Sequence, residues 1–374
     1  MESKYIHIVA FNIPYPPNYG GVIDVFYKMK ALHEAGVKII LHCFEYDRGK
    51  SAELELFCEK IFYYKRNTGV LSNISLLPYI VLSRKNKSLL KNLCNDDYPI
   101  LFEGLHCCYY IGNRQLKNRL KLYRSANIEH DYYWHLFKAE KNNFIKAAYY
   151  LLESFRLKLY EKTVKKADII FPISLKETEY FKKKFPDNKV VFLPAFHGNE
   201  EVTCLEGEGK YILYHGNLSV EENESAAIFL IKEVFHELSY PFVIAGLNPS
   251  KRLKELIAKY PHISLIDSPS EKEMHRLIQN AHVHILVTFQ ATGLKLKLLN
   301  VLYEGRFCLA NDKMLEGSGL ECLCEKANSP QEIKTKLDLF MKERFSLQEI
   351  EKRKGILLKK YSNSCNIQLL MADL

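Results

Sequence analysis

Short apolar runs and longer amphipathic stretches alternate in two successive series along this sequence. The first series opens with an apolar run at 4–13, an amphipathic stretch at 22–37 and a second apolar run at 38–44. Continuous apolar runs of this length are typical of buried parallel strands, and apolar residues at helical spacing predict a helix. We therefore expect a βαβ opening and an α/β protein.

Further strand-like runs extend both series. They are 98–106, 121–128, 167–174 and 188–194 in the first series, and 211–217, 241–248, 262–267, 282–289 and 306–312 in the second. The segment AFHGNEEVTCLEGEGK after Pro194 is polar and lacks periodicity, which is typical of a linker. The pattern predicts two doubly wound Rossmann-like domains facing one another across a cleft. Ligands of such sheets bind at the carboxyl ends of the strands, so we expect the functional site in that cleft.

The composition narrows the class of protein. A chain of 374 residues suits two domains of average size. No run of 18 or more apolar residues occurs and the start lacks the features of a signal peptide, so we expect neither a membrane span nor secretion. The 10 cysteines form no C-x-x-C pair and lie mostly inside apolar runs. This favours free thiols in a reducing cytoplasm over disulfides or a zinc site.

The charge is concentrated in the first half of the chain. Residues 1–200 hold 31 Lys and Arg against 21 Asp and Glu, and the remainder holds 22 against 23. A basic half is attracted to an anionic membrane surface, a phosphate-bearing lipid or nucleic acid, although a solvated lysine-rich surface is an alternative. The segment 144–168 is amphipathic, aromatic and basic, so it either rests on anionic lipid headgroups or is a core helix with lysines pointing to water.

Glycines follow the first strand of each predicted domain. A hydride-transfer enzyme would carry G-x-G-x-x-G after the first strand, and this chain has N-Y-G-G instead, ending in Gly20 and Gly21. Glycines at that point let the backbone approach a ligand, and the helix that follows offers its N-terminus to an anion; the alternative is an ordinary tight turn. Gly216, in the sequence YILYHGN, has the corresponding place in the second series.

The stretch TFQATGLKLKLLNVLYEGRFCLAND predicts a strand end, a turn at Gly293 and a helix whose first turn holds Lys295 and Lys297. Lysines at a helix start oppose the helix dipole, so they need a reason to be there. Lys297 and Asn300 are three residues apart and share a helix face. Backbone N–H groups, the dipole and Lys297 together suit a diphosphate, and Asn300 could bond a neighbouring sugar hydroxyl. Lys295 lies on another side and is a weaker candidate.

Three segments carry a resemblance to a known family. They are the loop PYPPNYGG at 14–21, the segment GLKLKLLNVLYEG at 293–305, and NIEHDYY at 127–133, which Arg124 precedes. Together with the two-domain plan, they resemble GT-B glycosyltransferases of family four, in particular a bacterial subgroup that builds surface polysaccharides. Those enzymes transfer a sugar from a nucleotide-sugar donor to an acceptor, usually with retention of anomeric configuration.

The resemblance implies a domain plan and a set of partners. It implies an acceptor-binding domain at 1–197, a linker at 198–209, a nucleotide-sugar-binding domain at 210–355 and a helix at 356–374 that returns to the first domain. The implied donor is a UDP- or GDP-sugar, and the implied acceptor is a glycan or an undecaprenyl-linked glycan. A cytoplasmic protein with peripheral contact to the inner face of an anionic plasma membrane is expected, with no nucleic acid as partner.

The chain departs from this family at the donor site. The family has Glu-x7-Glu in this region, where the second Glu binds the ribose hydroxyls; here Thr292 and Asn300 stand at the two positions. Asn217 stands where an Arg commonly follows the first strand of the second domain, so Lys297 is the candidate for the phosphate charge. Asp267, at the end of the run 262–267, joins the donor-binding candidates. A related GT-B sugar-nucleotide epimerase and a non-catalytic sugar-nucleotide-binding partner of a polysaccharide assembly system remain alternatives.

The catalytic candidates come from the first domain. The sequence shows no D-x-D motif, so we expect a metal-independent reaction and no cofactor. The resemblance implies that His106 lies near the transferred sugar, although a core histidine is the alternative. Glu103 and His130 are secondary candidates.

Overall fold

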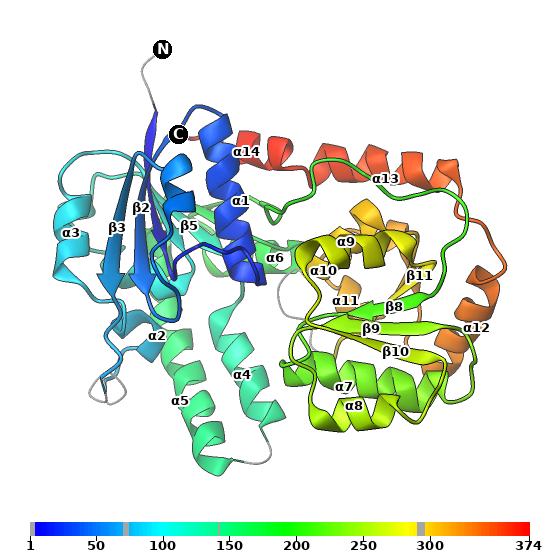
Figure 1. Cartoon of the computed structure of the whole chain (residues 1–374). Helices are drawn as coiled ribbons and strands as arrows, with labels where there is room; N and C mark the ends of the chain where they lie inside the picture. Colours follow the sequence, from blue (N-terminus) through cyan, green and yellow to red (C-terminus); the bar gives the residue numbers. More distant parts are fainter. Residues whose placement is uncertain (1–3, 70–74, 141–142, 290–295) are drawn as a thin grey trace. The chain divides into compact units, whose positions relative to one another are not determined.

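The computed structural model describes residues 4–69, 75–140, 143–289 and 296–374. The chain divides into two compact units. Unit one comprises Met1–Gly198 and Asn363–Leu374, and unit two comprises most of Asn199–Ser362. Both units are layered α/β structures with a parallel sheet (Figure 1), which confirms the predicted fold class.

Unit one is built on a sheet of seven strands among its described residues. In spatial order the strands are β3 (Lys60–Lys65), β2 (Lys38–Glu45), β1 (Tyr5–Ala10), β4 (Ile100–Glu103), β5 (Lys121–Ser125), β6 (Ile169–Pro172) and β7 (Lys189–Val190). Every neighbouring pair is parallel. The strand order reverses between β1 and β4, so the carboxyl ends of these two strands form the topological switch point where such sheets bind ligands.

Helices cover both faces of this sheet (Figure 1). On one face Ile6 and Ile8 pack with the helices α1 (Gly20–Glu34) and α14 (Asn363–Met371). On the other face Val9 and Phe102 pack with short elements and with α6. These elements are α2 (Tyr79–Leu82), α3 (Lys87–Leu93), the 3-10 turns η3 (Leu105–Tyr110) and η5 (Glu161–Lys166), and α6 (Leu175–Lys184). The side chains of β1 are therefore buried on both faces of the sheet, which explains the continuous apolar sequence of this strand.

A helical hairpin extends unit one. It consists of α4 (Glu129–Ala139) and α5 (Phe144–Tyr160), which pack against each other (Figure 1). The α5 helix ends at Tyr160 and continues directly into η5, so the amphipathic stretch of the sequence is a helix followed by a 3-10 turn. Among the described helices, none combines the length and apolar character required to cross a membrane.

Unit two is built on a second sheet, with six strands among its described residues. In spatial order they are β10 (Ile263–Asp267), β9 (Phe242–Gly246), β8 (Ile212–His215), β11 (Val283–Leu286), β12 (Phe307–Ala310) and β13 (Glu325–Lys326). All neighbouring pairs are parallel. The order reverses between β8 and β11, so the switch point of unit two lies at the carboxyl ends of these strands.

The helices of unit two also lie on both faces of their sheet (Figure 1). One face packs against α7 (Glu221–Leu230) with its π-helical extension η6 (Ile231–Phe235), α8 (Lys251–Ile257) and α12 (Pro330–Phe340). The remaining helices are α9 (Glu271–Asn280), which packs on the opposite face, α10 (Leu296–Glu304), α11 (Asp312–Leu315) and α13 (Leu347–Lys360). The apolar side of α10 is buried, as its leucine-rich sequence predicts.

Candidate active-site regions in the two units

The switch point of unit one brings together the PYPPNYGG loop and His106. Phe11 follows β1 and His106 follows β4, and their ring centroids are 5.6 Å apart. Gly20 and Gly21 begin α1 beside them. A Cβ atom on Gly21 would lie 2.8 Å from the tip of the Phe11 ring, so a larger residue at this position would have to displace that ring. The PYPPNYGG loop and His106 therefore belong to one region.

His106 is held neutral in this region. Its Nδ1 atom is buried, lies 3.8 Å from a carboxylate oxygen of Glu129 and has no hydrogen-bond partner among the described residues. Burial first, and then the positive charges of Arg84 and Arg66, hold the pKa of His106 well below its usual range. A neutral imidazole with a low pKa is a weak proton acceptor, so its geometry suits a hydrogen bond to a substrate hydroxyl better than full proton abstraction.

Glu129 is a candidate that the sequence analysis missed. It is the first residue of α4 and is buried, and burial raises its pKa to about 8 despite the opposing charge of Arg84. At neutral pH it is therefore mostly protonated and could donate a hydrogen bond to Nδ1 of His106 after a small movement. The NIEHDYY motif was the available signal, but the histidine of that motif was chosen instead of the glutamate.

The side chain of His130 contacts α6 and η5, whereas that of Glu129 lies near His106. The Nε2 atom of His130 is 3.0 Å from the hydroxyl of Tyr180 on α6 and 3.7 Å from the buried carboxylate of Glu161. Burial lowers the pKa of His130. The side chain thus joins α4 to α6 and η5, and the structure does not bring it to His106 through any contact among the described residues.

Glu103 lies inside a buried ionic network. Its carboxylate accepts a hydrogen bond of 2.7 Å from Lys28, and Lys28 also donates to Asp24 at 3.0 Å. Arg124 binds both oxygens of Asp24, at 2.9 and 3.0 Å. Although burial alone would raise it, Arg124 and Lys28 hold the pKa of Asp24 well below its usual range. Glu103 is committed to Lys28 in the interior, so the geometry gives it a structural role and removes it from our catalytic candidates.

The switch point of unit two contains the Gly216–Asn217 turn. A Cβ atom on Gly246, at the end of β9, would lie 1.8 Å from the carbonyl oxygen of Gly216, so this position admits only glycine. Asn217 closes a local turn, because its Oδ1 atom accepts hydrogen bonds from the backbone N–H and the hydroxyl of Ser219. The side chain of Asn217 therefore holds the loop after β8 in its turn conformation, at the carboxyl end of the strand.

Lys297 lies beside the end of β8. It is the second residue of α10, its Nζ atom donates to Oδ1 of Asn223 at 3.2 Å, and it lies 5.4 Å from the centroid of the Tyr214 ring. Burial and the charge of Lys297 lower the pKa of His215 to about 3. Both ring nitrogens of His215 are buried without a hydrogen-bond partner among the described residues. A fixed positive charge and an unsatisfied imidazole thus lie together at the switch point.

Asn300 lies one turn further along α10 than Lys297. It is half-buried, and its Oδ1 atom accepts a hydrogen bond of 2.9 Å from the side chain of Asn199. Lys297 and Asn300 therefore share a side of the helix, but Lys297 contacts Asn223 and Asn300 contacts Asn199. Three further donor candidates, Thr292, Gly293 and Lys295, lie outside the described residues.

Asp267 is held away from Lys297 on the edge strand β10. Its carboxylate pairs with Lys254 at 2.7 Å and accepts a hydrogen bond of 2.8 Å from the hydroxyl of Ser268, and the bond from Lys254 lowers the pKa of Asp267. The strand β9 separates β10 from β8, which corresponds to roughly 10 Å at the usual strand spacing. The structure therefore does not bring Asp267 together with the Lys297 region.

The start of α7 is acidic, which constrains where an anion could bind. Glu221, Glu222 and Glu224 occupy its first turn, and Glu222 accepts a hydrogen bond from the hydroxyl of Thr288 after β11. Carboxylates at a helix N-terminus already satisfy its dipole, so a phosphate is better placed towards Lys297. Among the described residues, no group of three or more His, Cys, Asp or Glu side chains is arranged to hold a metal ion.

Comparisons with known proteins agree with this architecture. No family model matches the sequence. A Klebsiella pneumoniae protein described as an uncharacterized 44.6 kDa protein in the cps region is 26% identical over 339 residues, which cover 84% of each chain. Anabaena Alr3699/HepE in complex with UDP has a TM-score of 0.67 at 9% identity and 99% coverage of both chains. The lipopolysaccharide outer core galactosyltransferase WaaB has a TM-score of 0.64 at 14% identity, over 99% of this chain and 100% of that one.

The solved neighbours match essentially the entire chain, including both sheets. At this level of identity such likeness concerns the fold. The strand orders of the two sheets place a switch point in each unit, independently of the comparisons. The chain therefore has the GT-B fold of nucleotide-sugar glycosyltransferases.

Proposed function

We propose that this protein is a glycosyltransferase that transfers a sugar from a nucleotide-sugar donor to a glycan acceptor in the synthesis of a surface polysaccharide. The observation that carries this proposal is the position of Lys297, whose charge lies at the switch point of unit two beside the buried His215. Stabilising the departing diphosphate is the main electrostatic demand of sugar transfer, and a fixed cation at the strand ends meets it.

In this proposal, different residues of unit two bind different parts of the donor. Lys297 meets the diphosphate, and the nucleotide lies against the backbone of the Gly216–Asn217 turn. Asn300 binds the ribose hydroxyls in place of the family's glutamate, with Asn199 fixing the orientation of its amide. The complexes of the solved neighbours support a UDP-sugar donor, because HepE and the plant protein UGT89C1 are described with UDP or UDP-L-rhamnose.

The residues of unit one receive the acceptor. His106 hydrogen-bonds the acceptor or the transferred sugar, and Glu129 fixes the imidazole through Nδ1. A retaining, metal-independent reaction fits a chain in which positive side chains and helix ends supply the charge stabilisation. The cps region of the Klebsiella relative supports a polysaccharide as the acceptor. In this proposal the acceptor is the glycan itself or a lipid-linked form of it, reached at the inner face of an anionic plasma membrane.

A thermal-shift screen tests the donor half of the proposal. UDP-, GDP-, ADP- and CMP-sugars are compared with the free sugars and with inorganic pyrophosphate, because a ligand of the folded state raises the melting temperature by mass action. We expect one nucleotide class to raise the melting temperature in the wild type and to lose that effect in Lys297→Ala. A protein that no nucleotide sugar stabilises would contradict the proposal.

Two alternatives are separated by turnover. Release of free sugar and nucleoside diphosphate without any acceptor would favour a GT-B sugar-nucleotide epimerase. Binding of the nucleotide without turnover on any glycan or lipid-linked acceptor would favour a non-catalytic partner of an assembly system, a role that Thr292 and Asn300 in place of the family's glutamates make worth testing.

A further inference from the structure

A buried arginine at the carboxyl ends of the strands of unit one lacks a counter-charge. Arg84 follows α2 and is 5% exposed. Its Nε atom donates to the carbonyl oxygen of Phe11 at 2.9 Å, and its Nη1 atom donates to that of Ile80 at 2.6 Å. Its Nη2 atom has no acceptor and its guanidinium forms no ion pair among the residues that the structure describes. Burying a charge is costly unless the charge is paired, so a partner for Arg84 is expected.

The other buried arginines differ from Arg84 in this respect. Each of them donates from both Nη atoms to carbonyl or carboxylate oxygens; they are Arg119, Arg124, Arg306 and Arg353. Among the five buried arginines in the described part of the chain, Arg84 alone leaves one Nη atom without an acceptor. Its guanidinium therefore keeps one hydrogen-bonding position open to solvent or to a ligand.

A second arginine beside Arg84 has the same feature. Arg66 follows β3 and is half-buried, and its Nε atom donates to the hydroxyl of Ser83 at 3.0 Å. Neither of its Nη atoms has an acceptor among the described residues. Its guanidinium carbon lies 4.3 Å from the ring centroid of Tyr46 and 5.3 Å from that of Tyr79. Burial, and then the charge of Arg66, lower the pKa of Arg84 to about 10, so the two cations are close enough to repel each other.

The titratable groups around the two arginines do not supply the missing negative charge. Burial raises the pKa of Glu129 to about 8, so this carboxyl group is mostly protonated at neutral pH. His106 is neutral, because burial and the two arginine charges hold its pKa well below its usual range. The carboxylate of Glu153 is paired with Arg156 at 2.8 Å. Two positive charges therefore remain uncompensated by the described residues of this region.

The two arginines lie where a parallel sheet binds its ligands. Four side chains of this region follow the first four strands in turn, namely Phe11 after β1, Tyr46 after β2, Arg66 after β3 and His106 after β4. The bond from Arg84 to the carbonyl oxygen of Phe11 brings Arg84 to the same edge. Ligands of such sheets bind at the carboxyl ends of the strands. A ligand that presents a hydroxyl group to His106 can thus place an anionic group on the arginines.

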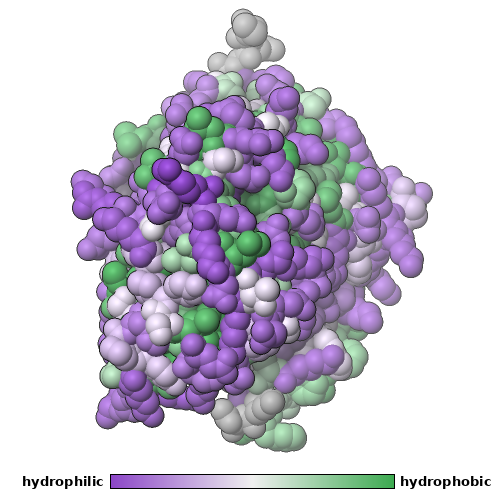
Figure 2. All heavy atoms as spheres, turned by 90° about the vertical axis from the view of Figure 1, so that its right-hand side faces the viewer, coloured by the Kyte–Doolittle hydropathy of each residue, from purple (hydrophilic) through white to green (hydrophobic). Residues whose placement is uncertain are grey.

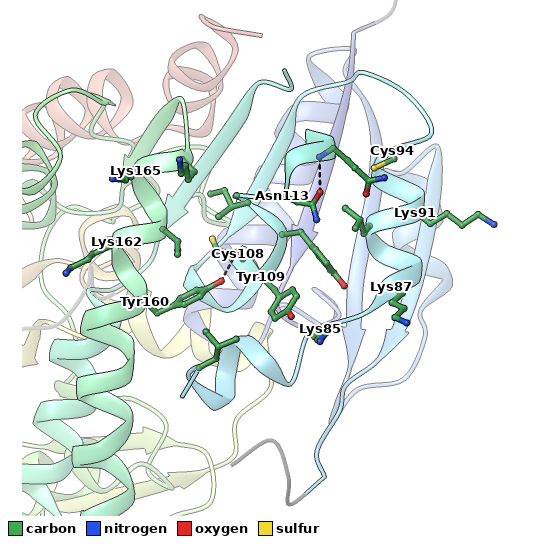
Figure 3. A pocket seen from close by; sticks show the side chains of 18 of the residues that line it. Lys85, Lys87, Lys91, Cys94, Cys108, Tyr109, Asn113, Tyr160, Lys162 and Lys165 are labelled. Carbon is green, nitrogen blue, oxygen red and sulfur yellow. Dashed lines mark hydrogen bonds between the residues drawn. The ribbon is translucent and has the colours of Figure 1, made fainter. Parts of the chain in front are cut away.

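Exposed charge elsewhere on the protein does not carry the same meaning. The face of the molecule in Figure 2 is mostly hydrophilic. In unit one, a pocket of about 1160 Å³ between α3, η3 and η5 is bordered by lysines, of which Lys91 and Lys162 extend away from it (Figure 3). An ammonium group at the surface is strongly hydrated and requires no partner. Arg84 is instead buried and is fixed by two carbonyl oxygens, so its charge has one direction.

We propose that Arg66 and Arg84 bind an anionic group of the acceptor, so that the acceptor is a sugar that carries a carboxylate or a phosphate. The inference rests on the proposed function, because it names the chemical class of the acceptor that unit one receives. A guanidinium binds either group through two parallel hydrogen bonds. The cation–π contacts with Tyr46 and Tyr79 hold the Arg66 guanidinium in place, so little side-chain freedom is lost on binding.

Binding of small anionic sugars to the full chain tests this inference. Glucuronate, galacturonate and glucose 6-phosphate are compared with glucose and galactose by ligand-observed NMR titration. The variants are Arg66→Gln and Arg66→Lys, because Arg84 also holds two backbone carbonyl oxygens and is left unchanged. The matched control is Arg114→Gln, which removes an exposed arginine of unit one that has no ion pair among the described residues.

We expect at least one anionic sugar to bind the wild type at least about tenfold more tightly than its neutral counterpart, as hydrogen bonds to charged groups allow. Arg66→Gln should abolish this preference, and Arg114→Gln should keep it. Arg66→Lys should keep part of it, because an ammonium retains the charge but not the planar fork of donors. Tighter binding of a uronate would identify a carboxylate as the anionic group, and tighter binding of glucose 6-phosphate would identify a phosphate.

Two results would overturn the inference directly. One is a wild type that binds no anionic sugar more tightly than its neutral counterpart. The other is an equal loss of the preference in Arg66→Gln and in the control Arg114→Gln, because the effect would then come from the net charge of the protein and not from this site.

Titration with UDP identifies the competing ligand. If Arg66→Gln weakens binding of UDP as much as it weakens binding of the anionic sugar, the arginines hold the diphosphate of the donor and the inference fails. Failure of the proposed function has a different signature: no nucleotide sugar stabilises the wild type, while the preference for anionic sugars and its dependence on Arg66 persist.

Discussion

The two switch points hold their charged groups in opposite ways. In unit one, Asp24, Lys28 and Arg124 are buried and neutralise one another, and the pKa shifts of His106 and Glu129 favour uncharged forms. In unit two, Lys297 remains half-buried beside the amide of Asn223 at the strand ends. The difference suits two kinds of ligand: an uncharged hydroxyl group at the first switch point and a diphosphate at the second.

The largest effect is expected from breaking the ionic network of unit one. Asp24→Asn removes the carboxylate that binds both Lys28 and Arg124, leaving buried positive charge without full compensation. We expect the free energy of unfolding to fall by about 3–5 kcal/mol. Denaturant titration measures it, with Glu34→Gln in the exposed Lys30–Glu34 pair as the control, which should change stability by no more than ~0.5 kcal/mol.

A loss in Asp24→Asn as small as that in the control would show that the network contributes little. The first switch point would then owe its geometry to apolar packing alone, and the contrast between the two units would weaken.

The next effect concerns the pH dependence of stability that Glu129 confers. Its pKa is raised to about 8 in the folded state, so between the ordinary glutamate pKa and 8 the folded chain keeps a proton that the unfolded chain releases. Stability is therefore greatest at low pH within this window and falls as the pH rises towards 8. Glu129→Gln cannot titrate, so at pH 8.5 it should be more stable than the wild type by on the order of 2–4 kcal/mol.

Unfolding free energies of both proteins, measured from pH 5 to 9 in steps, give the comparison. The two curves should converge at the acid end, because there Glu129 takes up its proton in the unfolded chain as well as in the folded wild type. Parallel curves across the whole range would mean that Glu129 is ionised in the folded protein and that the first switch point is not neutral.

Lys297 tests the second switch point. Lys297→Ala should weaken nucleoside diphosphate binding by roughly 1.5–3 kcal/mol, the usual range for hydrogen bonds to charged groups. Isothermal titration measures the dissociation constant, with Lys295→Ala as the matched control two residues earlier. We expect a much smaller change for Lys295. Small and equal changes would place the phosphate elsewhere and remove the proposed contrast in charge.

The smallest expected effect is on turnover. His106→Ala should lower kcat by at least about tenfold while donor affinity stays close to that of the wild type, because a group near the reacting sugar acts mainly in the transition state. Steady-state kinetics with a nucleotide-sugar donor and nucleotide titration separate the two quantities. Wild-type kcat in this variant would return His106 to the role of a core histidine.

The fold was largely predictable because the strands near the middle of each sheet are buried on both faces. Continuous apolar sequences identified β1 and β2, whereas β3 was not predicted; most side chains of this edge strand are partly exposed, and it has lysines at both ends. The run predicted at 98–106 is a strand only to Glu103, and its remainder turns into η3 at Leu105. Local sequence patterns indicate that a strand exists better than they indicate where it stops.

The candidate sites were less predictable because burial and pairing depend on distant parts of the chain. Asp24 and Lys28 in α1 look like solvent-facing residues in the sequence, yet both are buried, and Lys28 donates a hydrogen bond to Glu103, which lies 75 residues beyond it. In the NIEHDYY motif, the residue that lies near His106 is Glu129, at 3.8 Å, whereas His130 contacts Tyr180. Lys297 was found because a lysine at the start of an apolar helix conflicts with the helix dipole, which is a local signal.

The packing of α14 on α1 has a consequence for how the chain is made. Ile367 and Leu370 of α14 belong to the apolar core of unit one, and Lys4 donates a hydrogen bond to the backbone oxygen of Leu374 at 2.9 Å. A ribosome translates all of unit two between the first 198 residues and this last helix. Part of the core of unit one therefore stays exposed to solvent until α14 has been synthesised. Ribosome stalling or proteolysis before residue 363 would release a chain whose second unit is complete and whose first unit still exposes the apolar surface that chaperones recognise.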